Sequence, residues 1–169
     1  MSEGVRRGPV DNFRGGIAIR AKVVAMDTNR DPIPTTPIRT HHDLFALWEA
    51  IVGEPGFGRR TLWLSFLDDD QRPLKLILPF DDMPESVDTT TIGRLFDTVR
   101  EARAEGAIPY ASLAVMFSRP GSGRIREGDR AWARALHDLL SDQTPRWPVH
   151  LATDDGVVVL APDDLVIGA

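Results

Sequence analysis

Residues 110–132 read YASLAVMFSRPGSGRIREGDRAW, and they carry the clearest indication of the fold. Its first part, 110–117, is a continuous apolar run of strand length, which predicts a central strand buried on both faces of a sheet. A loop rich in glycine and arginine follows, and apolar residues at helical spacing predict a helix over 128–140. A buried strand that leads through a loop into a helix is typical of α/β proteins.

The rest of the chain shows the same alternation of helical and strand periodicities. Apolar residues recur at helical spacing in two further segments, and short apolar runs bounded by turn residues accompany them. The predicted elements are a helix from the N-cap Thr40 to Gly53, a hairpin of strands 61–67 and 74–78, a helix over 91–105, and strands 149–153 and 157–161 around the turn Asp154-Asp155-Gly156. This order predicts an α/β domain with a mixed-direction sheet and helices packed on it.

The N-terminal segment differs in charge from the body of the chain. The chain has 169 residues, which suits one domain, and a net charge of −5. Residues 1–37 hold six basic and four acidic residues, a net +2, whereas the remainder holds 14 and 21, a net −7. We therefore expect a flexible arm and proline-rich linker over 1–37 and the folded domain over 38–169. Residues 17–26 could form a strand of the domain or an arm that orders on a partner.

Composition excludes several classes of protein. The chain has no cysteine, so disulfides, thiol nucleophiles and cysteine-ligated metal sites are excluded. No apolar run approaches the roughly 18 residues of a membrane span, and the N-terminus has no signal-peptide pattern, so we expect a cytoplasmic protein without a membrane partner. The acidic body also argues against a broad nucleic-acid-binding surface.

The central stretch resembles the JAB/JAMM metalloprotease-like fold, especially its RadC-like branch. A hairpin and a helix precede a buried strand that leads into a signature loop. Pro120 and Gly121 fit the family's proline and small residue, and Asp129 opens the next helix as the family's aspartate does. The similarity covers roughly residues 60–165. It implies a three-layer arrangement like that of the JAB and cytidine-deaminase folds.

The same resemblance implies that the metal centre of the family is missing. Phe117 and Arg119 occupy the positions of the two zinc-binding histidines, and neither is a zinc ligand; the signature serine falls near Arg126. Asp129 alone remains, and one carboxylate cannot hold zinc. No glutamate lies in 61–67 to act on a zinc-bound water. The resemblance therefore implies a form of the fold without metal, cofactor or peptidase activity.

A second resemblance is to a group of actinobacterial proteins that share four segments with this chain. The shared segments are GFGRRTLW (56–63), LPFDDMP (78–84), SRPG (118–121) and DRAWARAL (129–136). This similarity covers most of residues 38–166 and implies no particular activity.

The glycine- and arginine-rich loop is the sharpest candidate for a binding site. Its candidate ligand-binding residues are Arg119, Gly121, Gly123, Arg124, Arg126 and Arg130. Backbone N–H groups and guanidinium groups in such a loop can bind a phosphate or a carboxylate, and α/β sheets often place ligands after a central strand. The alternative is a solvated turn whose arginines pair with Glu127 and Asp129. The Gly-Lys-Ser/Thr ending of a P-loop is absent.

Other polar residues fit structural roles better than catalytic ones. The acidic runs 68–70 and 81–82 suit turns and caps better than a cation site. Ser118 follows a buried strand without a G-x-S-x-G motif, and His150, in a strand, fits a packed or surface residue better than a base. The four tryptophans are expected to pack in the core, with Trp147 the most exposed of them.

Two functions from different classes remain open on this evidence. The first is a non-catalytic binding or regulatory domain on a metal-less JAB/RadC-like fold, with an unknown protein partner or a second copy of the chain; its N-terminal arm could pair with a sheet edge. The alternative is an anion- or nucleotide-binding protein, with or without enzymatic activity, that uses the loop 119–130 for a small anionic ligand.

Overall fold

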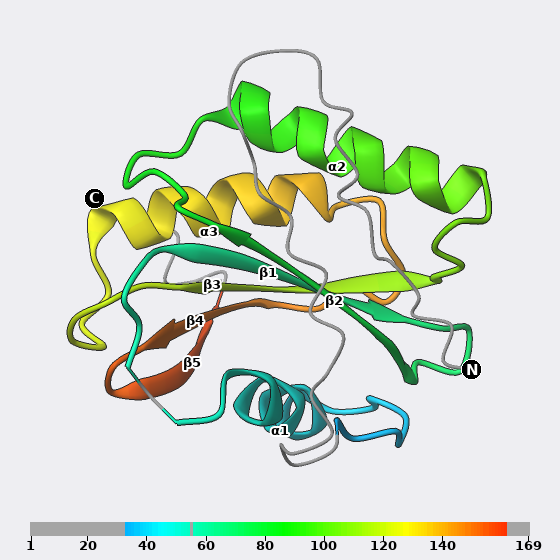
Figure 1. Cartoon of the computed structure of the whole chain (residues 1–169), viewed down its shortest axis with the longest axis horizontal. Coiled ribbons are helices and arrows are strands. Elements are labelled where there is room, and N and C mark those ends of the chain that lie inside the picture. The colour runs from blue at the N-terminus through cyan, green and yellow to red at the C-terminus, as the bar shows by residue number, and fades with distance from the viewer. Residues whose placement is uncertain (1–32, 55, 162–169) are drawn as a thin grey trace, which may run out of the picture.

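A five-stranded mixed sheet forms the centre of the molecule, with helices on both of its faces (Figure 1). The computed structural model describes residues 33–54 and 56–161. The elements in chain order are α1 (His41–Val52), β1 (Thr61–Leu67), β2 (Pro73–Asp81), α2 (Thr89–Ala104), β3 (Ser112–Ser118), α3 (Glu127–Leu139), β4 (Val149–Thr153) and β5 (Gly156–Leu160). The predicted strand 17–26 and most of the predicted arm lie outside the described residues.

The strands are ordered β2-β1-β3-β4-β5 across the sheet. β1 pairs antiparallel with β2 and with β3, β3 pairs parallel with β4, and β4 pairs antiparallel with β5. The parallel pair is possible because α3 crosses over between β3 and β4. The predicted α/β fold with a mixed-direction sheet is therefore confirmed.

The two faces of the sheet are covered by two separate hydrophobic clusters. α2 and α3 lie on one face and α1 on the other (Figure 1). Side chains alternate between faces along a strand, and in β3 Val115 and Phe117 join the cluster under α2 and α3, whereas Ala114 and Met116 join the cluster under α1. All seven residues of β3 are buried, as the apolar run predicted.

The first two helices begin where side-chain caps satisfy their free N–H groups. Thr40 caps α1, because its hydroxyl accepts from the Asp43 N–H at 3.1 Å while the Asp43 carboxylate accepts from the Thr40 N–H at 2.8 Å. α2 begins two residues earlier than predicted because the Asp88 carboxylate accepts from the N–H groups of Thr90 and Thr91. No helix of the described residues is long and apolar enough to cross a membrane.

The structure corrects the sequence prediction at two positions. β2 extends over nine residues instead of the predicted five, because its pairing with β1 continues past Leu78 to Asp81. Trp147 was predicted to be the most exposed tryptophan, and this was wrong: its side chain is 7% exposed and belongs to the cluster under α1. Its indole N–H donates to Oε1 of Gln71 at 3.3 Å, which ties the segment before β4 to the β1–β2 turn.

Candidate functional site

The loop between β3 and α3 is organised around one buried arginine. Arg119 directly follows β3, and its side chain is fully buried together with that of Asp129 in the first turn of α3. Its Nε donates to Oδ1 of Asp129 at 2.7 Å, and its Nη2 donates to Oδ2 at 2.7 Å. This bidentate pair is the strongest geometry available to the two side chains.

The remaining donors of the Arg119 guanidinium bind the loop backbone. Nη1 donates to the carbonyl oxygens of Pro120 and Ser122 at 3.1 and 3.0 Å, and Nη2 donates to that of Arg124 at 3.0 Å. A guanidinium has five N–H donors, so all of them have protein acceptors. The loop is wrapped around Arg119, which leaves that residue no donor for an external anion.

The backbone N–H groups of the two loop glycines are also occupied. Gly121 donates to Oδ2 of Asp154 at 2.7 Å, and Gly123 donates to Oδ2 of Asp155 at 2.7 Å. In return, the Asp154 N–H donates to the Gly121 carbonyl at 3.1 Å. We call these contacts, between the β4–β5 turn and the loop, the aspartate clasp. The clasp places carboxylates of the chain itself where an external anion was predicted.

Glycine is required at 121 and favoured at 123 by the geometry of the loop. Gly121 has φ +93°, and a Cβ at this position would lie 3.0 Å from Nη2 of Arg126. A Cβ on Gly123 would lie 3.3 Å from Oγ1 of Thr153. Both side chains would therefore crowd the contacts that hold the loop against the β4–β5 turn.

The electrostatics of the loop favour ionised carboxylates inside it. Burial raises the pKa of Asp129, but hydrogen bonds from the Arg119 side chain and the Arg126 N–H outweigh that effect, so the pKa is lowered on balance. The pKa of Asp154 is lowered by hydrogen bonds from the N–H groups of Phe57 and Gly121. Both groups are charged at neutral pH, which disfavours a second anion in their place.

The other predicted loop arginines lie outside this buried centre. Arg124 and Arg126 are exposed. Arg130 Nη1 lies 3.9 Å from a carboxylate oxygen of Glu127. The alternative of a solvated turn predicted that arginines pair with Glu127 and Asp129, and they do. It did not predict that Arg119 is buried. Five of the six predicted residues lie in the loop, Arg130 lies in α3, and the donors of Arg119, Gly121 and Gly123 are bound by the protein itself.

The candidate nucleophile and base are not brought together. The Ser118 hydroxyl accepts from Nε1 of Trp63 at 2.8 Å and donates to the Thr61 carbonyl at 3.4 Å. Ser118 pairs with Ala152 across the sheet, two residues beyond His150. The His150 side chain is 1% exposed, its Nδ1 lies 3.2 Å from the Pro148 carbonyl, and no hydrogen bond joins it to Ser118 within the described residues. Both side chains have structural partners.

Phe117 and Arg119, which the JAB resemblance assigns to zinc-binding positions, do not fit a zinc ion. The Phe117 ring stacks on the Trp132 ring with centroids 4.9 Å apart, and Arg119 is paired with Asp129. Of the acidic runs, Asp68 caps the β1–β2 turn and Asp81 accepts from the Thr61 hydroxyl. Within residues 33–54 and 56–161, no group of three or more histidine and acidic side chains could hold a metal ion.

The chain matches no protein-family model, and no curated protein matches it. Sequence reasoning missed the clasp: Asp154 and Asp155 were predicted only as a hairpin turn. The sequence does show two adjacent carboxylates, Asp154 and Asp155, and a glycine-rich loop whose N–H groups need acceptors. It does not show that these carboxylates meet that loop.

Removing one partner of the Arg119–Asp129 pair should strongly destabilise the fold. Arg119→Met leaves a carboxylate buried without its counter-ion, so we expect the free energy of unfolding to fall by about 3–5 kcal/mol. The double variant Arg119→Met/Asp129→Leu should lose less than the sum of the two single variants, because the two residues act together. Urea unfolding followed by circular dichroism measures each value.

The matched control for this cycle is Arg124→Met, which removes an exposed arginine from the same loop. Its effect should stay within about 0.5 kcal/mol. Equal losses for Arg119→Met and Arg124→Met, or additive losses in the double variant, would contradict a structural role for the pair.

His150 should make stability depend on pH between neutral and acidic conditions. Burial lowers its pKa from 6.5 to about 4, so the unfolded chain binds a proton at a pH where the folded chain does not. Stability is therefore complete above about pH 6.5 and falls as the pH drops towards 4, by about 3 kcal/mol in total. Urea unfolding at pH 7.5 and 4.5 should show the loss in the wild type and a smaller loss in His150→Leu. Identical pH dependence in both proteins would show that His150 is not the group responsible.

Proposed function

We propose that this chain is a non-catalytic binding domain in which the loop after β3 is part of the scaffold. The observation that carries the proposal is the saturation of this loop: Arg119 uses all five N–H donors on protein acceptors, and the glycine N–H groups are bound by Asp154 and Asp155. In a reaction site such groups are free to bind a substrate, whereas in this loop they bind other parts of the protein.

The proposal includes the metal-less JAB/RadC-like fold that the sequence resembles. Its support is the order of a hairpin, a helix, a buried strand, a loop and a second helix, with Asp129 in the first turn of α3. On this interpretation Arg119, at a position where the family has a zinc-binding histidine, forms an ion pair with the one ligand that remains.

The two edges of the sheet differ in their protection against pairing with another chain. β2 carries Pro73, Pro79 and the exposed Lys75, which are features that discourage strand addition. β5 reads GVVVL, with neither a charge nor a proline, and Val158 and Val159 are each 40% exposed. No strand of the described residues pairs with the outer edge of β5 (Figure 1). β5 is thus the edge suited to binding another polypeptide by strand addition.

A second copy of the chain is the partner that we propose for this edge. A two-fold axis would relate two antiparallel β5 strands, so both subunits would contribute the same residues to the interface. Because β5 is uncharged, the two edges would approach without like-charge repulsion within the strands. The sheet would continue from one subunit into the next.

Lysine at the two exposed valines should separate such a dimer. Val158→Lys/Val159→Lys places charges on the edge and sets them against their symmetry mates, so we expect the dimer of the full-length protein to dissociate at least tenfold more readily. Sedimentation velocity across a concentration series measures the change. Circular dichroism should show that the variant keeps the wild-type fold.

The control is Ala104→Lys/Ala107→Lys, which adds the same charge at exposed positions away from β5. It should associate as the wild type does. A wild-type chain that is monomeric throughout the series, or a dimer that survives in the β5 variant, would show that β5 is not the interface.

Anion binding remains the second candidate function because two loop arginines are accessible. Arg124 and Arg126 are exposed, and within the described residues neither side chain is within ion-pair distance of a carboxylate. An anion bound by these two guanidinium groups would not require the occupied glycine N–H groups. It would, however, meet the ionised carboxylate of Asp154 nearby.

Thermal unfolding with phosphate, sulfate and ATP separates the two candidate functions. A ligand at 100 times its Kd adds about 2.7 kcal/mol, which moves the midpoint by roughly 5–10 °C in a domain of this size. If the loop is only a scaffold, the wild type and Arg124→Gln/Arg126→Gln should have the same unfolding midpoint in the presence of each anion. A shift of that size in the wild type that is lost in the variant would instead establish the loop as an anion site.

A further inference from the structure

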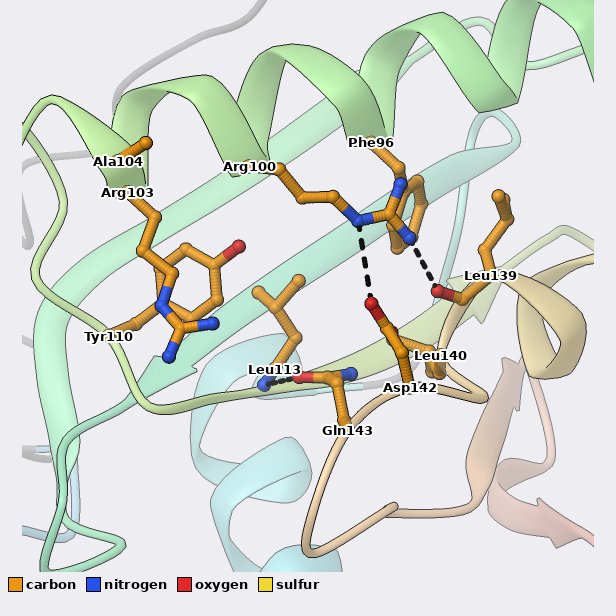
Figure 2. Close-up of a pocket in the computed structure, with 10 residues that line it drawn as sticks. All are labelled: Phe96, Arg100, Arg103, Ala104, Tyr110, Leu113, Leu139, Leu140, Asp142 and Gln143. Atoms are coloured by element: carbon orange, nitrogen blue, oxygen red, sulfur yellow. Dashed lines mark hydrogen bonds and ion pairs between the residues drawn. The ribbon is translucent and has the colours of Figure 1, made fainter.

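A cavity of about 440 Å³ lies between the C-terminal half of α2, the start of β3 and the turn after α3 (Figure 2). Its volume falls within the range of small-molecule sites. It is lined by Phe96, Arg100, Arg103, Ala104, Tyr110, Leu113, Leu139, Leu140, Asp142 and Gln143. None of these residues belongs to the loop after β3 or to β5, so the cavity is independent of the function proposed above.

One of the two arginines in the cavity, Arg100, has partners within the protein. Arg100 donates from Nη2 to the Leu139 carbonyl at 2.9 Å and from Nη1 to Asp97 at 3.2 Å, and its Nε lies 4.0 Å from an oxygen of Asp142. These contacts connect α2 to the end of α3. Arg100 thus lies between two carboxylates, Asp97 on its own helix and Asp142 at one end of the cavity, and Figure 2 marks its contact with Asp142 by a dashed line.

The second arginine is available to a ligand. The Arg103 guanidinium lies over the Tyr110 ring, 5.1 Å from its centroid, and the side chain is exposed. Within the described residues no carboxylate is within ion-pair distance of Arg103. Burial raises the pKa of Tyr110, so its hydroxyl remains a donor at neutral pH. In Figure 2 both side chains lie at the end of the cavity away from Asp142.

A buried amide supplies a further unused donor beside Leu113. Oε1 of Gln143 accepts from the Leu113 N–H at 2.6 Å, which fixes the orientation of the amide. Its Nε2 is buried and has no acceptor within the described residues. A buried donor without an acceptor destabilises the fold, and an acceptor brought beside it would remove that cost.

We propose that this cavity binds a monocarboxylate with a compact apolar body. The carboxylate lies against Arg103, and the apolar body packs on Leu113 and Leu140. A single negative charge fits because Arg103 is the one uncompensated cation in the lining, and Asp142 at the far end disfavours a dianion such as a phosphate monoester.

Phenylacetate and its neutral isostere phenylacetamide test the proposal. In ¹H–¹⁵N NMR titrations of the full-length protein, phenylacetate should shift the Leu113 amide and the side-chain amide of Gln143 with a saturable profile. Phenylacetamide should bind at least tenfold more weakly, because it lacks the charge. Acetate, which lacks the apolar body, should also bind more weakly.

Arg103→Gln should weaken phenylacetate binding by about 10- to 100-fold, the usual effect of losing a hydrogen bond to a charged group. The matched control Arg94→Gln removes an exposed arginine of α2 outside the cavity and should bind as the wild type does. Equal binding of phenylacetate and phenylacetamide, unchanged binding in Arg103→Gln, or no saturable shift up to about 10 mM would overturn the proposal.

A carboxylate attached to an apolar group occurs both in free organic acids and at the carboxyl end of a polypeptide. The peptide Gly-Gly-Phe, with a free or an amidated C-terminus, separates these two sources. A free-ended peptide that binds at least tenfold more tightly than phenylacetate, with the amidated form inactive, would assign the site to a chain end. Phenylacetate binding that exceeds that of the peptide would assign it to a free acid.

Discussion

The buried ion pair of Arg119 and Asp129 is the interaction on which the junction of β3 and α3 depends. The attraction within a buried ion pair offsets the desolvation free energy of the two charges only when their remaining donors and acceptors also form hydrogen bonds. Three loop carbonyls meet that condition for Arg119, and the Arg126 N–H meets it for Asp129. The pair thus specifies one path for the loop and caps α3 at the same time. That path in turn presents the glycine N–H groups to the β4–β5 turn.

This arrangement separates the usual ligand position of an α/β sheet from the two surfaces that we propose for binding. The end of β3, where such folds often hold a ligand, is filled by arginine and aspartate side chains of the protein itself. The apolar edge of β5 and the cavity between α2 and α3 lie on other parts of the molecule. A scaffold of this kind can vary its binding surfaces without disturbing the junction at its centre.

Local patterns predicted the elements well because neighbouring residues determine them. Thr40 with Asp43 indicated the start of α1, and the apolar run indicated that β3 is buried on both faces. The candidate site was less predictable because its contacts join distant segments: nothing near Asp154 indicates that its carboxylate meets Gly121. Arg119 resembles any loop arginine in the sequence, and only tertiary packing makes it a buried residue.

The aspartate clasp also affects how the C-terminal hairpin opens. Amide protons exchange with solvent only when their hydrogen bonds break, and segments that open together exchange together. The N–H groups of Gly121 and Gly123 belong to a surface loop, where fast exchange is usual, yet their acceptors lie on the β4–β5 turn. Their protons are released when that turn separates from the loop. These two glycines therefore report, from within the loop, on the separation of the β4–β5 turn from it.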